Sequence, residues 1–499
     1  MNIKKPYCIG LNCYDNNLNK GYNTISGEVF EKDFNNYCEN FSIYPTIIPH
    51  KERVIAIGDI HGDMNLAINF LKVAKVIEEV NIKALLELKI KKHFIKEYIY
   101  TLNIKKKSII SLNESIYNKH LYSDIADHIK NQIEVVYRYY QIDNEYYVKI
   151  IQEDNNPLHL DIPSNIIFDN NRWFKWIGKK TYVVQVGDQI DRCRPWNNNN
   201  CNVSTTTIND EDSDLEIMLL YDSLDKIAQK VGGRLFSLLG NHEIMNIKGD
   251  MRYVSYKGVK EFSPPPLSKD YKHGKHFRIN KFKTIISKKM ACTRSTILVI
   301  GDYLFVHGGI VNELAYSMKM IDINSIIRKF LHGSAQYSKI LQKLLDSSKY
   351  SPLWYRKLAF IPEDIDGIQH ADCNNIYDPI IQNLNSINTS TILSNSTISI
   401  LNKSNGNKSI IQQNKNLNNY IISSEPTIQI KGMIIGHTPQ FTVFEKGITT
   451  ACNNKIIRVD IGASSAFDKF APRNEARETQ VIEIITDLET KISKIKILK

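Results

Sequence analysis

The stretch RVIAIGDIHG, residues 53–62, joins an uninterrupted apolar run to a turn that carries Asp59 and His61. An apolar run of this length that ends at a glycine predicts a buried strand, from Arg53 to Ile57. Three later runs end in the same way: residues 181–186 before Gly187, 234–239 before Gly240 and 433–435 before Gly436. The pattern predicts several buried strands whose tips carry polar residues.

Helical patterns lie between these runs, at residues 64–77 and 214–231. Alternation of strands and helices predicts a layered α/β domain. Residues 295–307 form two apolar runs split by Gly301-Asp302, which predicts a hairpin. Residues 456–460 and 479–485 are candidates for further strands, so a second sheet is expected.

Two segments interrupt this scheme, residues 78–175 and 379–424, and we interpret both as insertions. The second contains no acidic residue and is dense in Asn, Ser, Thr and Ile, which predicts a low-complexity, mobile loop. The first contains strand-like runs at 135–140 and 146–151, so we expect it to be partly folded. Residues 1–50 are interpreted as an N-terminal extension and residues 51–499 as one interrupted domain.

The composition predicts a soluble protein but does not identify its binding partner. The formal net charge is +11, which would attract nucleic acid, an anionic membrane or a phosphorylated substrate equally. The lysines are spread through Ile- and Asn-rich stretches, which is typical of a compositional bias rather than of a binding patch. No signal peptide or membrane span is visible, so a soluble, intracellular protein, cytoplasmic by default, is expected.

The eight cysteines show neither a CxxC pair nor a regular spacing. This pattern indicates neither a zinc knuckle nor a disulfide framework. A reducing compartment is therefore the default expectation.

Five short motifs carry the chemistry, four at the strand tips and one at the end of the hairpin: GDIHG at 58–62, GDQIDR at 187–192, GNHE at 240–243, VHGG at 306–309 and GHTP at 436–439. A site for two divalent ions needs oxygen and imidazole ligands from several rigid points, with one carboxylate that bridges the ions. The motifs supply such a set: Asp59, His61, Asp188, Asn241, His307 and His437.

In this order the motifs resemble those of the calcineurin-like metallophosphoesterases, in the phosphoprotein phosphatase branch. Within that branch, LWYR at 353–356, GHTPQ at 436–440 and VDIGASS at 459–465 are similar to the bacterial-type, Shewanella-like protein phosphatases. The resemblance implies a four-layer α/β/β/α sandwich with insertions, and a dinuclear site at the loops that leave the central strands.

The resemblance also implies how the ligands are shared. Asp59, His61 and Asp188 would hold the first metal, and Asp188, Asn241, His307 and His437 the second, with Asp188 as the bridge. The ions, which would be Mn, Fe or Zn, would share a hydroxide that attacks the phosphorus in line.

Further residues are expected to bind the phosphate and to move a proton. Arg192 and Arg356, with Asn241, are the candidate phosphate ligands, because a guanidinium binds two oxygens at once. His242 would protonate the leaving oxygen, with its ring oriented by Asp191. A surface ion pair for Asp191 and Arg192, and packing of Arg356 over Trp354, remain structural alternatives. The chain departs from the eukaryotic serine/threonine phosphatases at Cys193-Arg194-Pro195, where those enzymes have a glycine after the arginine.

The predicted function is metal-dependent hydrolysis of phosphomonoesters, with phosphoproteins carrying Ser/Thr or Tyr phosphate as substrates. One alternative is a nucleotide or dinucleoside-polyphosphate hydrolase. Another is a catalytically silent, basic binding module that kept the fold. The intact ligand set disfavours the silent module, whereas substrate identity depends on loops that the motifs do not define.

Overall fold

The computed structural model describes residues 37–38, 44–80, 135–142, 145–152, 166–169, 172–195, 200–262, 271–335, 338–387 and 429–499. Within these ranges two six-stranded sheets organise the chain. The first sheet has the order β10 (Arg294–Ser295), β9 (Arg234–Leu238), β8 (Tyr182–Gln185), β2 (Arg53–Ile57), β16 (Val481–Thr486) and β17 (Ser493–Leu498). The second has the order β1 (Ile47–Ile48), β11 (Ile297–Ile300), β12 (Tyr303–Val306), β13 (Gly432–Ile435), β15 (Ile456–Arg458) and β14 (Thr449–Ala451).

The strands that carry the motifs are central and largely parallel. In the first sheet β2 pairs in parallel with β8, and β8 with β9. In the second sheet β12 pairs in parallel with β13, and β13 with β15. Because parallel strands end at the same edge, the residues that follow them are brought together.

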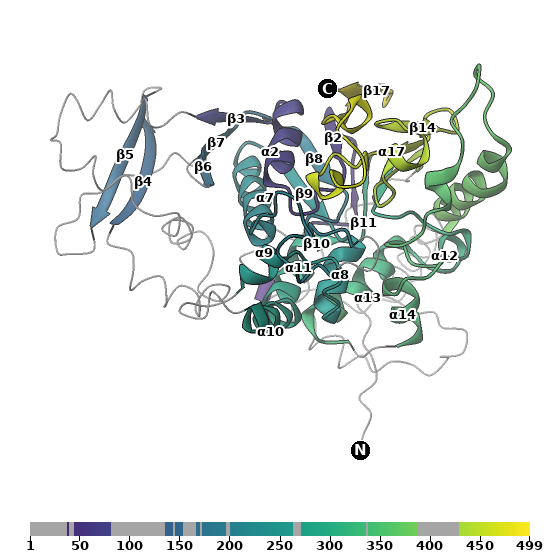
Figure 1. Cartoon of the computed structure of the whole chain (residues 1–499). Helices are drawn as coiled ribbons and strands as arrows, with labels where there is room; N and C mark the ends of the chain where they lie inside the picture. The colour runs from purple at the N-terminus through teal and green to yellow at the C-terminus, as the bar shows by residue number, and fades with distance from the viewer. Residues whose placement is uncertain are drawn as a thin grey trace, which may run out of the picture.

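The two sheets face each other and helices cover their outer faces. One apolar core combines Val183 of β8, Phe305 of β12 and Ile434 of β13, so it fills the space between the sheets. The same core includes Leu71 of α2 (Met64–Val73) and Tyr221 of α7 (Asp214–Lys230), which lie beside β2, β8 and β9 in Figure 1.

A second core covers the other face of the second sheet. It joins Val299 and Met433 to the helices α11 (Ser287–Thr293), α13 (Met320–His332) and α14 (Lys339–Leu345). The layers are therefore helix, sheet, sheet and helix, and the predicted α/β/β/α sandwich is confirmed.

The remaining described elements surround this sandwich. The short strands are β3 (Ile77–Val80), β6 (Ile166–Asp169) and β7 (Arg172–Trp176) in one sheet, and β4 (Val135–Ile142) and β5 (Glu145–Gln152) in a hairpin. The other α-helices include α8 (Asn241–Lys248), α9 (Tyr256–Lys260), α10 (Tyr271–Lys281), α12 (Asn312–Ser317), α17 (Gln440–Val443) and a helical segment at 378–387. Single 3-10 or π turns lie at Phe282–Ile286, Lys357–Phe360, Cys373–Tyr377, Ser465–Phe467 and Glu475–Arg477.

Most predicted elements are present, with boundary differences that have local causes. The strand predicted at Arg53 to Ile57 is β2 with the same bounds, and the hairpin predicted at 295–307 is β11 and β12. The helix predicted over residues 64–77 ends at Val73, because Lys75 adopts a left-handed φ of 54° and Ile77 begins β3.

Parts of the two predicted insertions are described. The strand-like runs of the first insertion form β4 and β5. The beginning and the end of this insertion, β3 and β7, pair with each other as antiparallel strands. In the second, residues 379–387 continue a helix in which Ile380 and Leu384 are buried, so the loop prediction is wrong for that part. Residues 388–424, like most of 81–171 and nearly all of 1–43, lie outside the described residues, and the domain boundaries stay a prediction.

Three disulfides join described cysteines: Cys38–Cys292, Cys193–Cys201 and Cys373–Cys452. The prediction that the cysteines form no disulfide framework is therefore wrong. Two of the pairs are 254 and 79 residues apart in sequence, so only the fold brings their Cα atoms to 5.5 and 5.3 Å. The expectation of a reducing compartment rested on that prediction and loses its support.

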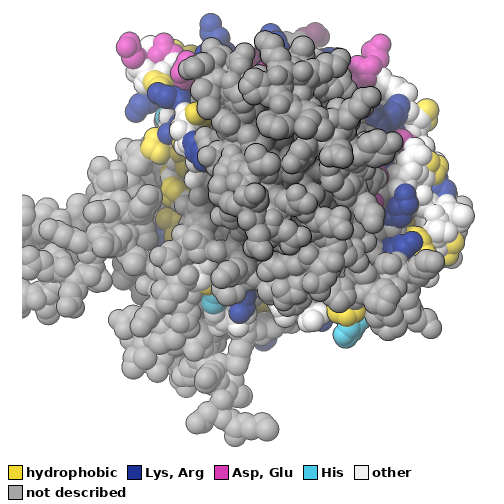
Figure 2. Space-filling view, turned by 90° about the vertical axis from the view of Figure 1, so that its left-hand side faces the viewer, with side chains coloured by type: hydrophobic (Ala, Val, Ile, Leu, Met, Phe, Trp, Pro, Cys, Tyr) yellow, Lys and Arg dark blue, Asp and Glu magenta, His cyan; other side chains and the backbone are white. Residues whose placement is uncertain are grey.

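Two surface properties bear on partners. Among the described helices, none has both the length and the apolarity that crossing a membrane requires. On the face shown in Figure 2, the visible described Lys and Arg side chains lie scattered among acidic, apolar and other side chains.

Candidate metal centre

The five motifs meet where the central strands of both sheets end. Asp59 and His61 follow β2, Asp188 follows β8, Asn241 and His242 begin α8 directly after β9, His307 follows β12 and His437 follows β13. Backbone hydrogen bonds fix the loops to one another. The amides of Ile60 and His61 both donate to Asp188 O at 3.0 Å, and the amide of Gly436 donates to His307 O at 2.8 Å.

Four of the predicted site residues have a left-handed backbone, although none is a glycine. The φ angles are 50° at His61, 55° at Asp188, 73° at Asp191 and 68° at His437. Such conformations are uncommon for residues with a Cβ atom, and they cluster where a side chain must be aimed at a site. The strand ends are therefore shaped to turn these side chains toward each other.

Two motif glycines make room for carboxylates. A Cβ atom at Gly240 would lie 2.1 Å from Asp188 Oδ1, and one at Gly436 would lie 2.4 Å from Asp59 Oδ1. Both distances are too short for any side chain. Each glycine is thus required because its own backbone lies against the acidic side chain of another residue.

Asp188 lies at the centre of the cluster. Its Oδ2 is 3.2 Å from His307 Nε2 and 3.8 Å from His242 Nε2, and its Oδ1 accepts a hydrogen bond from the His242 amide at 3.0 Å. Asn241 Oδ1 lies 2.9 Å from His307 Nε2. One carboxylate therefore reaches side chains contributed by both sheets.

Asp59, His61 and His437 complete the cluster. Asp59 Oδ2 is 3.8 Å from His61 Nε2 and accepts the His437 amide at 3.1 Å. The rings of His307 and His437 are 4.9 Å apart, and those of His61 and His242 are 5.0 Å apart. All six predicted metal ligands are thus brought together, and each is buried.

Burial and the neighbouring charged groups shift the pKa values of the carboxylates in the cluster. Burial raises the pKa of Asp59 well above its usual range, and the neighbouring carboxylates Asp460 and Asp188 raise it further. Burial also favours neutral Asp188, but His307 and His242 outweigh it, so the pKa of Asp188 lies well below its usual value.

Two imidazoles are held neutral. Burial lowers the pKa of His61 well below its ordinary value, with the charge of Arg194 as the next cause. Burial, with His307 and Arg356, does the same to the pKa of His437. A neutral imidazole is the form that binds a metal.

The donor set fits two divalent ions. Ligand atoms of Asp188, His307 and His437 lie within 4.8 Å of one another, as do those of His61, Asp188 and His242, so Asp188 belongs to both groups. His437 Nε2 is buried and has no hydrogen-bond partner among the described residues. Carboxylate, amide and imidazole ligands of this kind suit first-row divalent metals.

His242 belongs to one of these groups and also makes the contacts of a proton donor. Its Nδ1 lies 2.8 Å from Asp191 Oδ2, which leaves Nε2 facing the cluster. Asp191 is fully buried and accepts hydrogen bonds from Asn246 Nδ2 at 2.8 and 3.0 Å. The role of His242 in proton transfer stays a prediction, and the structure shows that its ring is oriented by a carboxylate, as that role requires.

The sequence did not reveal the residues that hold Asp191 and the loops. Arg278 of α10, fully buried, lies 3.3 Å from Asp191 Oδ1 and donates to Asp214 Oδ2 at 2.7 Å and to Asn246 Oδ1 at 2.8 Å. Glu243 accepts the amides of Asp188, Gln189 and Gly240 at 3.0, 2.9 and 2.7 Å. Glu243 had a signal as the last residue of the GNHE motif, and Asn246 had one because it lies one helical turn after His242.

A further carboxylate lies beside the cluster. Asp460 follows β15, is 1% exposed, and has one oxygen without a hydrogen-bond partner among the described residues. Burial raises its pKa to about 6. Its position at a strand tip was a signal that the sequence offered.

The two predicted phosphate-binding arginines are placed differently. Arg356 donates to His437 O at 2.9 Å and Thr438 Oγ1 at 3.0 Å, and it lies near enough to Asp460, Asp188 and Asp59 for these carboxylates to favour its charge. Arg192 is 2% exposed and binds Gly62 O, Asn209 O and the hydroxyl of Ser465. The structure thus brings Arg356 toward the cluster and commits Arg192 to neighbouring loops.

Comparisons with known proteins agree with this site. Residues 158–380 match the family model of the calcineurin-like phosphoesterases. The match includes Asp188, Asn241, His242, His307 and Arg356, whereas Asp59, His61 and His437 lie outside it and join the site through the fold.

Two similar proteins have been identified by sequence. An uncharacterized protein of Acanthamoeba polyphaga mimivirus is 29% identical over 289 residues, which cover 54% of this chain and 96% of that protein. Shewanella-like protein phosphatase 2 of Arabidopsis thaliana is 25% identical over 352 residues, which cover 62% of this chain and 70% of the relative. The predicted family resemblance is confirmed.

Among solved structures, the cold-active protein-tyrosine phosphatase of a psychrophilic Shewanella species is similar. The TM-score is 0.41 at 16% identity, with 92% of this chain and 84% of that chain covered.

Proposed function

We propose that this chain, which carries a calcineurin-like phosphoesterase domain and is a metal-dependent hydrolase of phosphoric esters, removes phosphate from phosphoproteins. The observation that carries the proposal is the position of Asp188, within reach of imidazoles from both sheets and common to two groups of ligand atoms. A carboxylate so placed is suited to bridging two ions.

The metal ligands in this proposal are those of the motifs. Asp59, His61 and Asp188 would hold one ion, and Asp188, Asn241, His307 and His437 the other. When bound, the ions would activate a water and neutralise the phosphoryl oxygens. The burial of the ligands excludes bulk water from around them, which strengthens every electrostatic interaction in the site.

The protein's own groups supply the proton and the orientation. His242 Nε2 faces the cluster, so it is placed to give a proton to the leaving oxygen of the ester. Asp191 fixes the ring through Nδ1. Arg278 and Asn246 in turn hold the carboxylate of Asp191.

Arg356 and Asn241 are the phosphate ligands we propose from the predicted set. Arg356 Nη1 is held by the loop that carries His437, which positions the rest of the guanidinium beside the cluster. The contacts of Arg192 disfavour such a role for it, because they occupy both of its Nη atoms.

The substrate class rests on one relative. The Arabidopsis protein is named a protein phosphatase, and its similarity spans 62% of this chain. We therefore favour phosphoproteins over nucleotides and dinucleoside polyphosphates.

The test is hydrolysis of an aryl phosphate by chelated protein to which manganese is returned, with Asp188→Asn as the control. We expect activity only in the parent protein, followed by faster turnover of phosphopeptides than of nucleotides. Faster turnover of nucleotides would replace the phosphoprotein proposal with the nucleotide one. Equal, negligible rates for parent and variant with manganese, iron and zinc would support a silent binding module.

A further inference from the structure

The loop after β8 carries two arginines, two residues apart, whose surroundings are opposite. Arg192 donates to Gly62 O and Asn209 O at 2.8 Å each, binds the Ser465 hydroxyl, and pairs with Glu211 at 3.2 Å. These contacts lie on three different segments, around Gly62, around residues 209–211 and at Ser465. Arg192 therefore braces the loops around the site through both of its Nη atoms, and only its Nε, which is buried, has no hydrogen-bond partner among the described residues.

Arg194 is held by only one of its nitrogens. Nη1 donates to Asp191 O at 3.0 Å and to Cys193 O at 2.9 Å, both in its own loop. Its Nε and Nη2 make no hydrogen bond within the part of the chain that the structure describes. An arginine anchored in this way keeps donors of its fork for a ligand.

Two aromatic rings direct Arg194 toward the metal centre. Its guanidinium lies 4.9 Å from the ring of Phe467 and 5.7 Å from that of Tyr253. Phe467 also contacts the ring of His61, at 5.7 Å, and Tyr253 contacts the ring of His242, at 4.9 Å. Arg194 is thus stacked on the same two rings that flank a predicted metal ligand and the predicted proton donor.

The charge of Arg194 acts on the site in agreement with this position. It is the second cause, after burial, of the lowered pKa of His61. In the other direction, Asp188, Asp191 and Asp460 favour the charged form of Arg194 against its burial. The guanidinium is therefore within electrostatic reach of the carboxylates at the centre of the cluster.

From these contacts we propose that Arg194, rather than Arg192, binds the phosphoryl oxygens of the substrate from the β8 side, opposite Arg356. The inference rests on the proposed phosphatase function and adds a residue that determines phosphate affinity. Arg356 comes from the loop before Lys357–Phe360 and is tied to the His437 loop, so the two guanidinium groups reach the cluster from different segments.

The start of this loop is fixed on both sides of the arginine. The Cys193 amide donates to Tyr253 O at 2.9 Å, and Cys193 is joined to Cys201. A covalent closure over eight positions limits how far Arg194 can move away from Tyr253. The side chain is therefore positioned before substrate arrives, which reduces the entropy lost on binding.

The experiment measures binding of inorganic phosphate to the manganese-loaded protein by calorimetry, alongside KM and kcat for an aryl phosphate. We expect Arg194→Gln to weaken phosphate binding by about tenfold to a hundredfold, as for loss of a charged hydrogen-bond donor. KM should rise in parallel. Arg194→Lys keeps the charge and should recover part of the affinity.

Arg252→Gln is the matched control. Arg252 also lies over the Tyr253 ring, at 5.9 Å, but its side chain is 70% exposed and paired with Asp250. This variant should bind phosphate as the parent does. Arg192→Gln should instead lower the unfolding temperature, because it removes the brace between loops, whereas Arg194→Gln should leave that temperature unchanged.

Two results separate the failure of this inference from the failure of the proposed function. Equal phosphate affinity in the parent and Arg194→Gln, with the parent hydrolysing the ester, would overturn the role of Arg194 alone. Phosphate binding that depends on Arg194 in a parent without esterase activity would support Arg194 as an anion ligand and overturn the phosphatase function.

Discussion

The strand-tip loops and the disulfide-linked segments are held in place by different means. At the strand tips, left-handed residues such as Asp188 and His437 and short hydrogen bonds aim polar side chains at one point. Away from the tips, Cys38–Cys292 and Cys373–Cys452 join segments that lie far apart in sequence. The first arrangement positions the predicted site residues, and the second links peripheral segments to the core. Substitutions at the strand tips should therefore change activity, whereas loss of a disulfide should change the free energy of unfolding.

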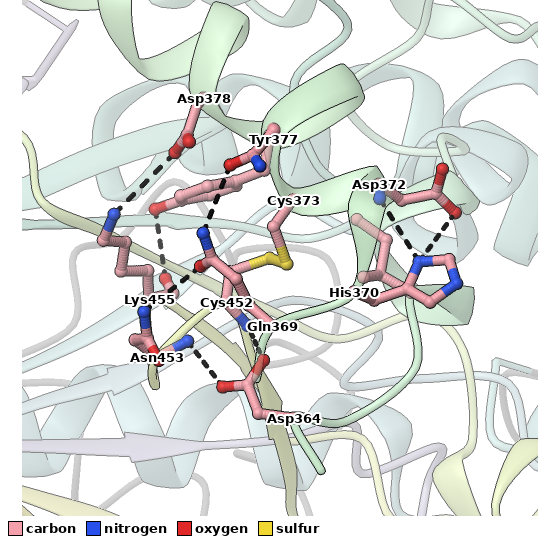
Figure 3. The surroundings of a disulfide bond; sticks show 12 residues. Asp364, Gln369, His370, Asp372, Cys373, Tyr377, Asp378, Cys452, Asn453 and Lys455 are labelled. Carbon is pink, nitrogen blue, oxygen red and sulfur yellow. Dashed lines mark hydrogen bonds and ion pairs between the residues drawn. A yellow bond between two sulfur atoms is a disulfide. The ribbon is translucent and has the colours of Figure 1, made fainter. Parts of the chain in front are cut away.

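Figure 3 shows the second arrangement around Cys373–Cys452. Asp364 accepts the amides of Cys452 and Asn453 at 3.0 and 2.6 Å, and the Tyr377 hydroxyl donates to Lys455 O at 3.1 Å. These bonds link the segment before β15 to the helix-containing segment 362–378. None of these residues belongs to the predicted site.

The largest effect is expected from Asp188→Asn. Loss of the carboxylate shared by both ligand groups should lower kcat/KM by about a thousandfold or more, since an ion contributes several kcal/mol to the transition state. Metal content should fall, whereas the far-ultraviolet circular dichroism should stay that of the parent. A variant that keeps both ions and full activity would show that Asp188 is no bridge.

The next effect concerns stability and comes from the peripheral region. Cys38→Ala combined with Cys292→Ala removes a cross-link between two buried positions, on the segment before β1 and on α11. The free energy of unfolding should fall by about 2–5 kcal/mol, measured with denaturant under non-reducing conditions. At a temperature where the variant is folded, kcat/KM should match the parent. Equal unfolding midpoints would contradict the tie between periphery and core.

Asp460→Asn tests whether a buried carboxylate at a strand tip lowers the free energy of unfolding. The pKa of Asp460 is raised from 3.8 to about 6, so the folded protein binds this proton more tightly than the unfolded chain. The cost of ionising Asp460 is absent below pH 3.8 and complete above pH 6; at about 1.4 kcal/mol per pKa unit it reaches at most about 3 kcal/mol.

In chelated protein, Asp460→Asn should therefore raise the free energy of unfolding at pH 7.5 and change little at pH 4. Added manganese should reverse the ranking, because the parent carboxylate lies beside the ions. Lower stability of the chelated variant at pH 7.5 would mean that Asp460 is needed for packing rather than for charge.

The sequence predicted the strand tips but not the disulfide-linked segments, for a physical reason. A strand tip is a local pattern, in which an apolar run, a glycine and a polar residue are adjacent, so the sequence alone located β2 and the Asp59 that follows it. A disulfide between Cys38 and Cys292 depends on how the whole chain folds, and no spacing reveals it.

The same limit applies within the site. The motif placed Arg192 on the correct loop, but the direction of its guanidinium is set by Ser465 and Glu211, which come from other segments. Arg278 lies in no motif, and only tertiary packing brings it to Asp191. Local pattern therefore located the ligands, whereas the residues that orient them required the structure.

The smallest of the four effects is expected from Asp191→Asn, which acts on the site through another residue. The variant keeps a side chain of the same shape beside His242 Nδ1 but removes the carboxylate that orients the ring. Residues that orient a reacting group in this way contribute about tenfold to a hundredfold.

We expect kcat to fall by that factor with little change in KM, because the ring of His242 is less firmly oriented without the carboxylate of Asp191. Asp225→Asn is the control, since Asp225 of α7 pairs with Arg234 of β9 and its loss should leave kcat unchanged. A kcat for Asp191→Asn equal to that of the parent would assign Asp191 to holding the loop. In that case Asp191 would serve to hold its loop in place, as the disulfides hold their segments, and not to orient His242 for chemistry.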